Sequence, residues 1–225
     1  MNRKKSTSEG EDLITLFSGV DSASVSDALD KLGIAGQALG IMPLERYEKV
    51  TIGAAFTVRY IPASQSRGNI GNYIDDVGVG DVVVIDNGGR RDCTVWGDIM
   101  TQYAGLRGIA GTVIDGTCRD VNRAISDHYP IFAAANWMRT GKDRVDLASV
   151  NEIVSIGGVQ VRPGDIVVAD ANGVVFVPSD RALEVAKVAQ RIEKSEAGIR
   201  DMIAGGATIA EAREAFSYMQ LNRAE

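Results

Sequence analysis

Residues 114–120, IDGTCRD, place an arginine beside an aspartate directly after an apolar segment. We expect a strand to end at Asp115-Gly116 and a helix to begin after Arg119-Asp120. This pattern has two interpretations. One is a turn followed by a capped helix. The other is a site in which Asp120 binds a metal ion and Arg119 binds a substrate oxyanion through its planar guanidinium.

A second carboxylate, Asp98 in the sequence WGDIM, precedes Arg119 with twenty residues between them. Gly97 beside it allows a backbone segment or a ligand to approach closely. A carboxylate at this place would face Asp120 across the loop, and paired carboxylates suit hydrated Mg²⁺. The alternative is that Asp98 is a solvated residue of a helix.

The expected strands at 82–85 and 112–115 flank one helix, so we expect them to be parallel, with their carboxyl ends at one edge of a sheet. Ligands of α/β sheets gather at that edge. The loops at 87–89 and 116–118 are each expected to open a helix, whose unpaired N–H groups favour an anion. With Arg119 they predict a carboxylate pocket. A plain glycine turn is the alternative for either loop.

The remaining pattern is that of an α/β domain. Apolar residues at helical spacing predict helices at 22–33 and 90–108. We expect Ser22 or Ser24 to cap the first helix, and Gly33 and Gly108 to end the two helices. Val95, Ile99, Tyr103 and Leu106 form the apolar face of the second. The other predicted elements are strands at 51–62, 110–116 and 131–137, a short helix at 119–130, hairpins within 152–178, and a long helix from about Asp180 to Met202.

Composition limits the class of protein. The 225 residues contain no linker or sharp change in composition, so we expect one domain with a helical tail. The net charge of −6 and the lack of a basic stripe argue against a nucleic-acid partner, and the strand-sized apolar runs argue against a membrane span. Cys93 and Cys118 make no disulfide framework, and no secretory signal precedes them. We therefore expect a cytoplasmic protein.

The stretch 88–120, GGRRDCTVWGDIMTQYAGLRGIAGTVIDGTCRD, resembles the RraA-like family, which includes class II 4-hydroxy-4-methyl-2-oxoglutarate and 4-carboxy-4-hydroxy-2-oxoadipate aldolases. The family motif is an aspartate, twenty residues, and then Arg-Asp, which Asp98 and Arg119-Asp120 match without a gap. The likeness runs from SVSDALDKLG through VRPGDIVVADANGVVFVP to the helix after it. It implies a swivelling β/β/α-type single domain, assembled as a homotrimer or homohexamer.

The resemblance also implies boundaries and roles. Residues 13–203 would form the catalytic domain after a flexible N-terminus at 1–12, while the helical tail at 204–225 has no family counterpart. Asp120 would be the direct protein ligand of Mg²⁺ or Mn²⁺, held otherwise through waters. Arg119 would contact substrate oxygens, and Asp98 would orient a metal-bound water. The substrate carboxylate would meet backbone N–H groups in the stretch of Gly97, Asp98, Ile99 and Met100.

The implied activity is that of a class II pyruvate aldolase, a metal-dependent lyase that cleaves a 4-hydroxy-2-oxo acid to pyruvate. A divalent cation would stabilise the enolate as a Lewis acid, so no Schiff-base lysine is needed, and the same chemistry would decarboxylate oxaloacetate. The alternative, from a different class, is a protein-binding regulator of an RNA-degrading endonuclease. A methyltransferase is not indicated, because no glycine-rich strand-to-helix loop with an acidic ribose partner is present.

Each of four charged residues outside the motif has two possible roles. Lys142 and Arg144 form either a solvated loop or a contact for the distal carboxylate of a diacid. By the resemblance, an acidic residue of the late helix, Glu193 or Glu196, reaches a neighbouring subunit's site. Surface salt-bridging is the alternative for both glutamates, and alignment does not choose between them.

Other side chains with reactive or aromatic groups have simple interpretations. The only histidine, His128, is expected in a turn before Pro130, so one chain cannot hold a multi-histidine metal site. Cys93 and Cys118 are expected to be small apolar fillers rather than nucleophiles. Trp96 is expected to pack into the core or a subunit interface.

Overall fold

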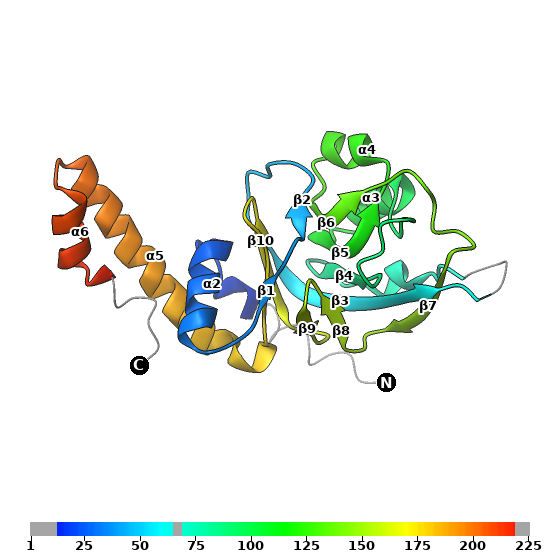
Figure 1. Ribbon diagram of the computed structural model, residues 1–225, viewed down its shortest axis with the longest axis horizontal. Helices are drawn as coiled ribbons and strands as arrows, with labels where there is room; N and C mark the ends of the chain where they lie inside the picture. The colour runs from blue at the N-terminus through cyan, green and yellow to red at the C-terminus, as the bar shows by residue number, and fades with distance from the viewer. Residues whose placement is uncertain (1–12, 65–68, 219–225) are drawn as a thin grey trace.

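The computed structural model describes residues 13–64 and 69–218, and a mixed sheet of nine strands runs through them (Figure 1). The strand order is β1-β11-β10-β3-β4-β5-β6-β2, with β7 also pairing with β3. The strands are β1 (Gln37–Ala38), β2 (Met42–Pro43), β3 (Thr51–Pro62), β4 (Val82–Asp86), β5 (Gly111–Cys118), β6 (Ile131–Asn136), β7 (Val145–Val150), β10 (Ile166–Asp170) and β11 (Gly173–Val177). A separate hairpin joins β8 (Val154–Ile156) to β9 (Val159–Val161). The mixed α/β fold with a long C-terminal helix is thereby confirmed, while its swivelling designation stays a prediction.

The centre of the sheet is parallel, as expected from the sequence. Strands β3, β4, β5 and β6 pair side by side in parallel. All five residues of β4 are buried, which explains why its sequence VVVID does not alternate between apolar and polar residues. The helices α3 (Asp98–Leu106) and α4 (Val121–Ser126) connect these strands and lie together on one face of the sheet (Figure 1). The carboxyl ends of β4 and β5 therefore share one edge.

The other end of the sheet is antiparallel and is covered by different helices. Strands β10 and β11 form a hairpin whose two-residue turn is Ala171 and Asn172, and β10 continues the sheet on β3. Helices α2 (Ser22–Lys31) and α5 (Ala182–Ala204) pack there, with buried valine, leucine and alanine side chains between them and the strands. Strands β10 and β4 thus lie in one sheet, on either side of β3.

The first helix begins as predicted, but its cap is different. Asp21, rather than Ser22 or Ser24, is the N-cap residue, and its Oδ1 accepts a hydrogen bond of 2.8 Å from the backbone N–H of Ser24. Both serines are buried, and Ser22 Oγ donates to the Asp170 carboxylate. The chain turns away at Gly33, which has a φ of +66° and so favours glycine.

The predicted helix at 90–108 was too long. Helix α3 starts only at Asp98, eight residues later. The residues before it run beside the end of β5, where the Val95 N–H donates to the Thr117 carbonyl and the Arg119 N–H donates to the Trp96 carbonyl. These contacts take the backbone groups that a helix would need. The predicted apolar face was wrong for Ile99 and Leu106, which are 79% and 81% exposed, whereas Val95 and Tyr103 pack against the core.

Strand β5 continues past its predicted end. It runs to Cys118, with a register shift between Ile114 and Thr117 against β6. Gly116, with a φ of +157°, lies inside this irregularity. A glycine in a strand marks a bulge as readily as a strand end, and here it marks a bulge. Residues 116–118 therefore do not open a helix, and α4 begins after Asp120.

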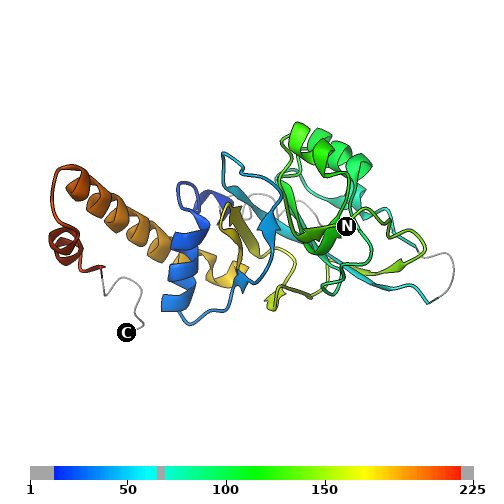
Figure 2. The same cartoon turned by 45° about the horizontal axis from the view of Figure 1, so that its top comes forward.

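The long helix extends away from the sheet (Figures 1 and 2). It follows a short turn, η2 (Ser179–Arg181), and ends beside α6 (Ile209–Ala215), which folds back on it. Thr208 and Glu211 form a capping box at the start of α6. The Phe216 ring lies on Gly198, where any side chain would overlap it. The predicted tail thus contains an ordered helix, while residues 1–12 and the tail's last seven residues lie outside the described ones.

Candidate active site

The motif residues meet at the N-terminus of α3. Gly97 is the N-cap residue of this helix and Asp98 is its first residue, while Arg119 and Asp120 directly follow β5. Asp120 Oδ2 lies 3.2 Å from the backbone nitrogen of Asp98 and 3.2 Å from Nε of Arg119. Two segments separated by twenty residues are therefore joined through one carboxylate oxygen.

Asp120 has an unusual backbone conformation. Its φ of 57° and ψ of 36° are left-handed, and its side chain makes no capping hydrogen bond to α4. For a residue other than glycine this conformation is uncommon and costs free energy, on the order of 1 kcal/mol. The carboxylate points instead toward α3. The capped-helix interpretation of this stretch is therefore wrong: Asp120 occupies the cap position without capping.

Gly97 is required by the close approach of the two segments. A Cβ at this position would lie 2.8 Å from Asp120 Oδ2 and 3.3 Å from Arg119 Nε. The backbone of Gly97 is extended, so the requirement comes from space rather than from backbone conformation. The expectation that this glycine permits a close approach is confirmed.

The backbone donors at the start of α3 already have partners. The Asp98 N–H donates to Asp120, and the Ile99 N–H donates to Oδ1 of Asp98 at 2.8 Å. An entering substrate carboxylate would have to displace these side-chain oxygens. In contrast, the structure gives the terminal nitrogens of Arg119 no hydrogen-bond partner among the described residues, and this side chain is about 40% exposed.

The glycine loop at 87–89 does not contribute to the site, contrary to the sequence-based expectation. It opens no helix, and its N–H groups are used internally: those of Asn87 and Gly89 donate to the Asp115 carbonyl, and that of Gly88 donates to Asp86. The carboxylates of Asp86 and Asp115 accept hydrogen bonds from the β8–β9 hairpin. These two acids therefore hold the hairpin on the sheet.

A cavity of about 290 Å³ opens beside the motif residues. Besides the stretch from Gly97 to Met100 and Arg119, its walls contain Tyr60, Ile70, Gly71, Thr94, Val95, Trp96, Thr140, Gly141, Lys142 and Val145. Lys142 belongs to the loop that was expected to be solvated or to contact a distal carboxylate. No sequence pattern indicated Tyr60 and Val145, because sheet pairing between β3 and β7 brings them here, or Ile70, whose carbonyl accepts a hydrogen bond from the Tyr60 hydroxyl.

A larger cavity, about 560 Å³, lies at the opposite end of the parallel strands. It is lined by the loop from Glu45 to Ile52 and by Ala110, His128 and Pro130, and it contains none of the predicted site residues. The smaller cavity is the candidate active site, because it lies at the carboxyl ends of the strands and carries the motif.

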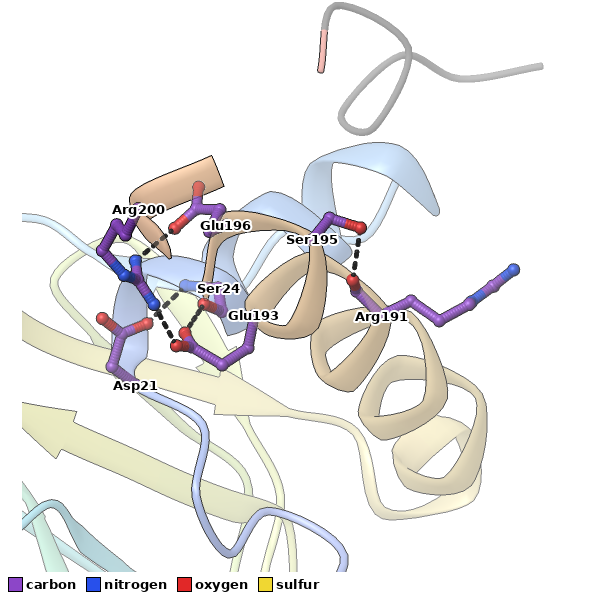
Figure 3. Close-up of polar contacts among 7 residues, drawn as sticks. All are labelled: Asp21, Ser24, Arg191, Glu193, Ser195, Glu196 and Arg200. Atoms are coloured by element: carbon purple, nitrogen blue, oxygen red, sulfur yellow. Dashed lines mark hydrogen bonds and ion pairs between the residues drawn. The ribbon is translucent and has the colours of Figure 1, made fainter. Parts of the chain in front are cut away.

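Glu193 and Glu196 lie elsewhere in the chain, on α5 (Figure 3). Glu193 contacts Arg200 at 2.6 Å through Oε1 and accepts a hydrogen bond from Ser24 through Oε2. Glu196 contacts the same arginine at 3.4 Å through Oε2. Burial raises the pKa of Glu196 above its usual value, and the nearby Arg200 opposes this effect. Within one chain, the two glutamates form an ion-pair cluster with Arg200 and do not join the motif residues.

The remaining reactive side chains behave as the sequence suggested. Burial raises the pKa of the Cys118 thiol to about 12 and also raises that of Cys93, so neither is a ready nucleophile. His128 is exposed in a left-handed turn after α4. Trp96 is buried, stacks on Tyr129 and donates from Nε1 to Thr101.

The donor set suits a hard divalent cation. Asp98 and Asp120 offer only carboxylate oxygens, and Asp120 is partly exposed. Among the described residues there is no group of three histidine, cysteine, aspartate or glutamate side chains that could enclose an ion. A cation at Asp120 would therefore keep several waters, which is how Mg²⁺ is usually bound.

The family of the chain follows from its sequence. Residues 22–176 match a family model described as "RraA-like: Aldolase/RraA". The chain belongs to the RraA-like family. This RraA-like protein is 35% identical over 182 residues to a Halalkalibacterium halodurans protein provisionally named 4-hydroxy-4-methyl-2-oxoglutarate aldolase, covering 80% of this chain and 83% of that one. It is also 44% identical over 203 residues to protein DlpA of Legionella pneumophila, covering 89% of this chain but 33% of DlpA. The chain thus spans about a third of the length of that relative.

Solved structures share the fold of this RraA-like protein. An uncharacterized protein from Pseudomonas syringae pv. tomato superposes with a TM-score of 0.83 at 42% identity, covering 90% of this chain and 97% of that one. RraAS2 of Streptomyces coelicolor, described as an unusual member of the RNase ES inhibitor RraA protein family, superposes with a TM-score of 0.77 at 29% identity, covering 84% and 96%. Among the described residues, no helix has the length and apolar character needed to cross a bilayer.

Proposed function

We propose that this protein is a divalent-metal-dependent lyase that cleaves a 4-hydroxy-2-oxo acid and releases pyruvate. The observation that carries the proposal is the meeting of Asp98, Arg119 and Asp120 at the N-terminus of α3, beside a cavity. Membership of a family described as aldolase/RraA supports the same reaction class. Mg²⁺ or Mn²⁺, held by Asp120, would supply Lewis-acid stabilisation of the enolate charge.

Arg119 and the start of α3 would bind the substrate, and Asp98 would transfer the proton. Arg119 would orient the substrate, because its terminal nitrogens are free to engage two oxygens. The N–H groups of Asp98, Ile99 and Met100 would bind the carboxylate next to the 2-oxo group, once the Asp120 carboxylate releases the first of them and the Asp98 carboxylate the second. Gly97 lets Asp120 and Arg119 lie close to this end of the helix.

Asp98 would manage the proton through a water. The proton of the 4-hydroxyl leaves, the C3–C4 bond breaks, and its electron pair passes into the pyruvate enolate while C4 becomes a carbonyl. The proton then returns to C3 of the enolate, which gives pyruvate and an oxo product. Asp98 is exposed at the cavity and is placed for this transfer through a water. Oxaloacetate decarboxylation would use the same enolate and is expected as a side activity.

We further propose a homotrimer or homohexamer in which a neighbour's α5 completes the site. Of the two candidate glutamates, Glu196 is better suited, because both oxygens of Glu193 already have partners while Oε1 of Glu196 has none among the described residues. The proposed catalytic unit is residues 13–203, which ends near the last residue of α5, and α6 lies beyond it.

The proposal is tested by pyruvate release from a panel of 4-hydroxy-2-oxo acids and oxaloacetate, with EDTA and with added Mg²⁺ or Mn²⁺. We expect activity only with the metal, and no adduct trapped by borohydride. Full activity in EDTA, or a borohydride-trapped lysine adduct, would rule out the metal-dependent mechanism.

A second candidate is a protein-binding regulator of an RNA-degrading endonuclease. The observation that favours it is the likeness to the Streptomyces protein, whose description names an RNase ES inhibitor family. An endonuclease inhibited by wild-type protein and equally by Asp120→Ala would assign this role to a surface independent of the metal site.

A further inference from the structure

Two buried polar side chains at the start of α3, Trp96 and Thr101, have no part in the proposed reaction. Each residue is only 2% exposed. The indole Nε1 of Trp96 lies 3.0 Å from Thr101 Oγ1, and that oxygen lies 3.1 Å from the Gly97 carbonyl oxygen. A chain of two hydrogen bonds therefore runs from the core to the backbone at the N-terminus of the helix.

The direction of this hydrogen-bond chain follows from its donors. An indole N–H can only donate, so Thr101 Oγ1 accepts from Trp96, and the single hydrogen of the hydroxyl is left for the Gly97 carbonyl. Trp96 is itself held in place, because its ring stacks on Tyr129 and its carbonyl accepts from the Arg119 N–H. The Thr101 hydroxyl is therefore fixed in one orientation.

The chain ends on the peptide group that joins Gly97 to Asp98. The oxygen of this peptide accepts from the Thr101 hydroxyl at 3.1 Å and from the Thr101 N–H at 3.0 Å. Its N–H, which belongs to Asp98, donates to Asp120 Oδ2. Because a trans peptide is planar, its oxygen and its N–H point in opposite directions, and holding the oxygen sets the direction of the N–H. Thr101 therefore orients the Asp98 N–H from the other side of the same peptide.

The Thr101 hydroxyl is not needed to form the helix. The Thr101 N–H alone makes the regular helical bond to Gly97, four residues earlier. Threonine is a weaker helix former than alanine, and a hydroxyl bonded to the preceding turn tends to destabilise a helix slightly. Thr101 also lies outside the cavity wall that the described residues form. An effect of its hydroxyl on a ligand would therefore pass through the Gly97–Asp98 peptide.

We propose that Thr101 and Trp96 are positioning residues, which aim the Asp98 N–H at the carboxylate of the ligand. The inference rests on the proposed function, which assigns this N–H to the substrate carboxylate. Hydrogen bonds to the oxygen of a peptide also polarise its N–H and make it a stronger donor. The substrate carboxylate is charged both before and during bond cleavage, so a loss of positioning should raise KM and leave kcat nearly unchanged.

The test removes the hydroxyl while keeping the shape of the side chain. In Thr101→Val, the KM for pyruvate release and the Kd of oxalate, titrated by calorimetry with Mg²⁺, should each rise about 10-fold. This is the lower end of the effect of one hydrogen bond to a charged group. Thr101→Ser keeps the hydroxyl and should return both constants to near their wild-type values.

Thr57→Val is the matched control. Thr57 is also buried, lies outside the cavity wall, and donates its hydroxyl to the backbone carbonyl of Glu152. The control should lose stability to a similar extent in thermal melts, because it loses the same kind of hydrogen bond. Its KM and its Kd for oxalate should stay at the wild-type values. If Thr101→Val does not fold, Thr101→Ala and Thr57→Ala provide the same comparison.

The outcomes separate this inference from the proposed function. Equal shifts in Thr101→Val and Thr57→Val, wild-type constants in Thr101→Val, or a Thr101→Ser variant that behaves like Thr101→Val would each overturn the inference and leave the lyase intact. A wild-type protein that releases no pyruvate from any substrate of the panel overturns the proposed function. The oxalate titrations then still test the positioning alone, and no binding of oxalate to wild type would overturn it.

Discussion

The backbone N–H of Asp98 donates to the carboxylate of Asp120 over 3.2 Å. The same oxygen contacts Arg119 Nε. The proposed metal ligand thus occupies one of the backbone donors that a substrate carboxylate would use. A cation on Asp120 would compete for this oxygen, so metal binding and the opening of the substrate position are expected to be coupled.

The first prediction concerns ligand binding without metal. Asp120→Ala removes the internal anion, so the metal-free variant should bind oxalate, a planar dicarboxylate, more tightly than metal-free wild type. The expected gain is ~2–5-fold, the scale of an anion at a helix N-terminus. With Mg²⁺ the order should reverse, because only wild type retains the metal ligand. Calorimetric titration with oxalate, in EDTA and in Mg²⁺, measures the affinities of both proteins. Equal affinities of wild type and Asp120→Ala without metal would contradict the coupling.

The second prediction concerns Gly97. A Cβ at this position would lie 2.8 Å from Asp120 Oδ2, so Gly97→Ala should displace the carboxylate and lower kcat/KM by ~10–10²-fold, with little loss of stability. Gly105→Ala is the matched control in the same helix, since nothing lies within 4 Å of its Cβ. The control should raise stability by up to ~1 kcal/mol and leave kinetics unchanged. Equal kinetics in the two variants would show that the close approach has no role.

The third prediction concerns the guanidinium of Arg119. Arg119→Lys keeps the charge but loses the planar fork, so kcat should fall by at least ~10²-fold. The matched control is Arg123→Lys on α4, whose partner is Asp127.

Asp98→Asn should keep metal binding and slow proton transfer by ~10²-fold or more. Steady-state kinetics with thermal melts check these variants, and normal turnover in Arg119→Lys would mean that the stretch is only a turn.

Some of these features could be predicted from the sequence and others could not. The parallel order of β4, β5 and β6 followed from buried apolar runs separated by helical stretches. The start of α3 did not, because pairing with the end of β5 decides the conformation of residues 90–97, and no local pattern reports a tertiary contact. Gly116 looked like a strand end but forms a bulge. The cavity wall at Tyr60 and Val145 depends on β3–β7 pairing, which single-sequence periodicity does not register.

The fourth prediction concerns the neighbouring subunit. If Glu196 acts in a neighbour's site, Glu196→Gln and Arg119→Lys should each be nearly inactive, yet a mixture refolded together should recover activity. In random oligomers about a quarter of the sites would pair an intact Arg119 with an intact Glu196. Recovery near that fraction is expected, measured by pyruvate release. Absence of recovery in mixed oligomers whose composition is confirmed would place the glutamate outside the site.

The measurement that tests the central claim most directly is pyruvate release by wild type and Asp120→Ala in parallel titrations with Mg²⁺, starting from EDTA-treated protein. We predict that wild-type activity rises from background to saturation with the metal. Asp120→Ala should stay at background throughout while melting at a temperature close to that of wild type. Metal-independent pyruvate release by wild type, or a full Mg²⁺ response in Asp120→Ala, would contradict the account.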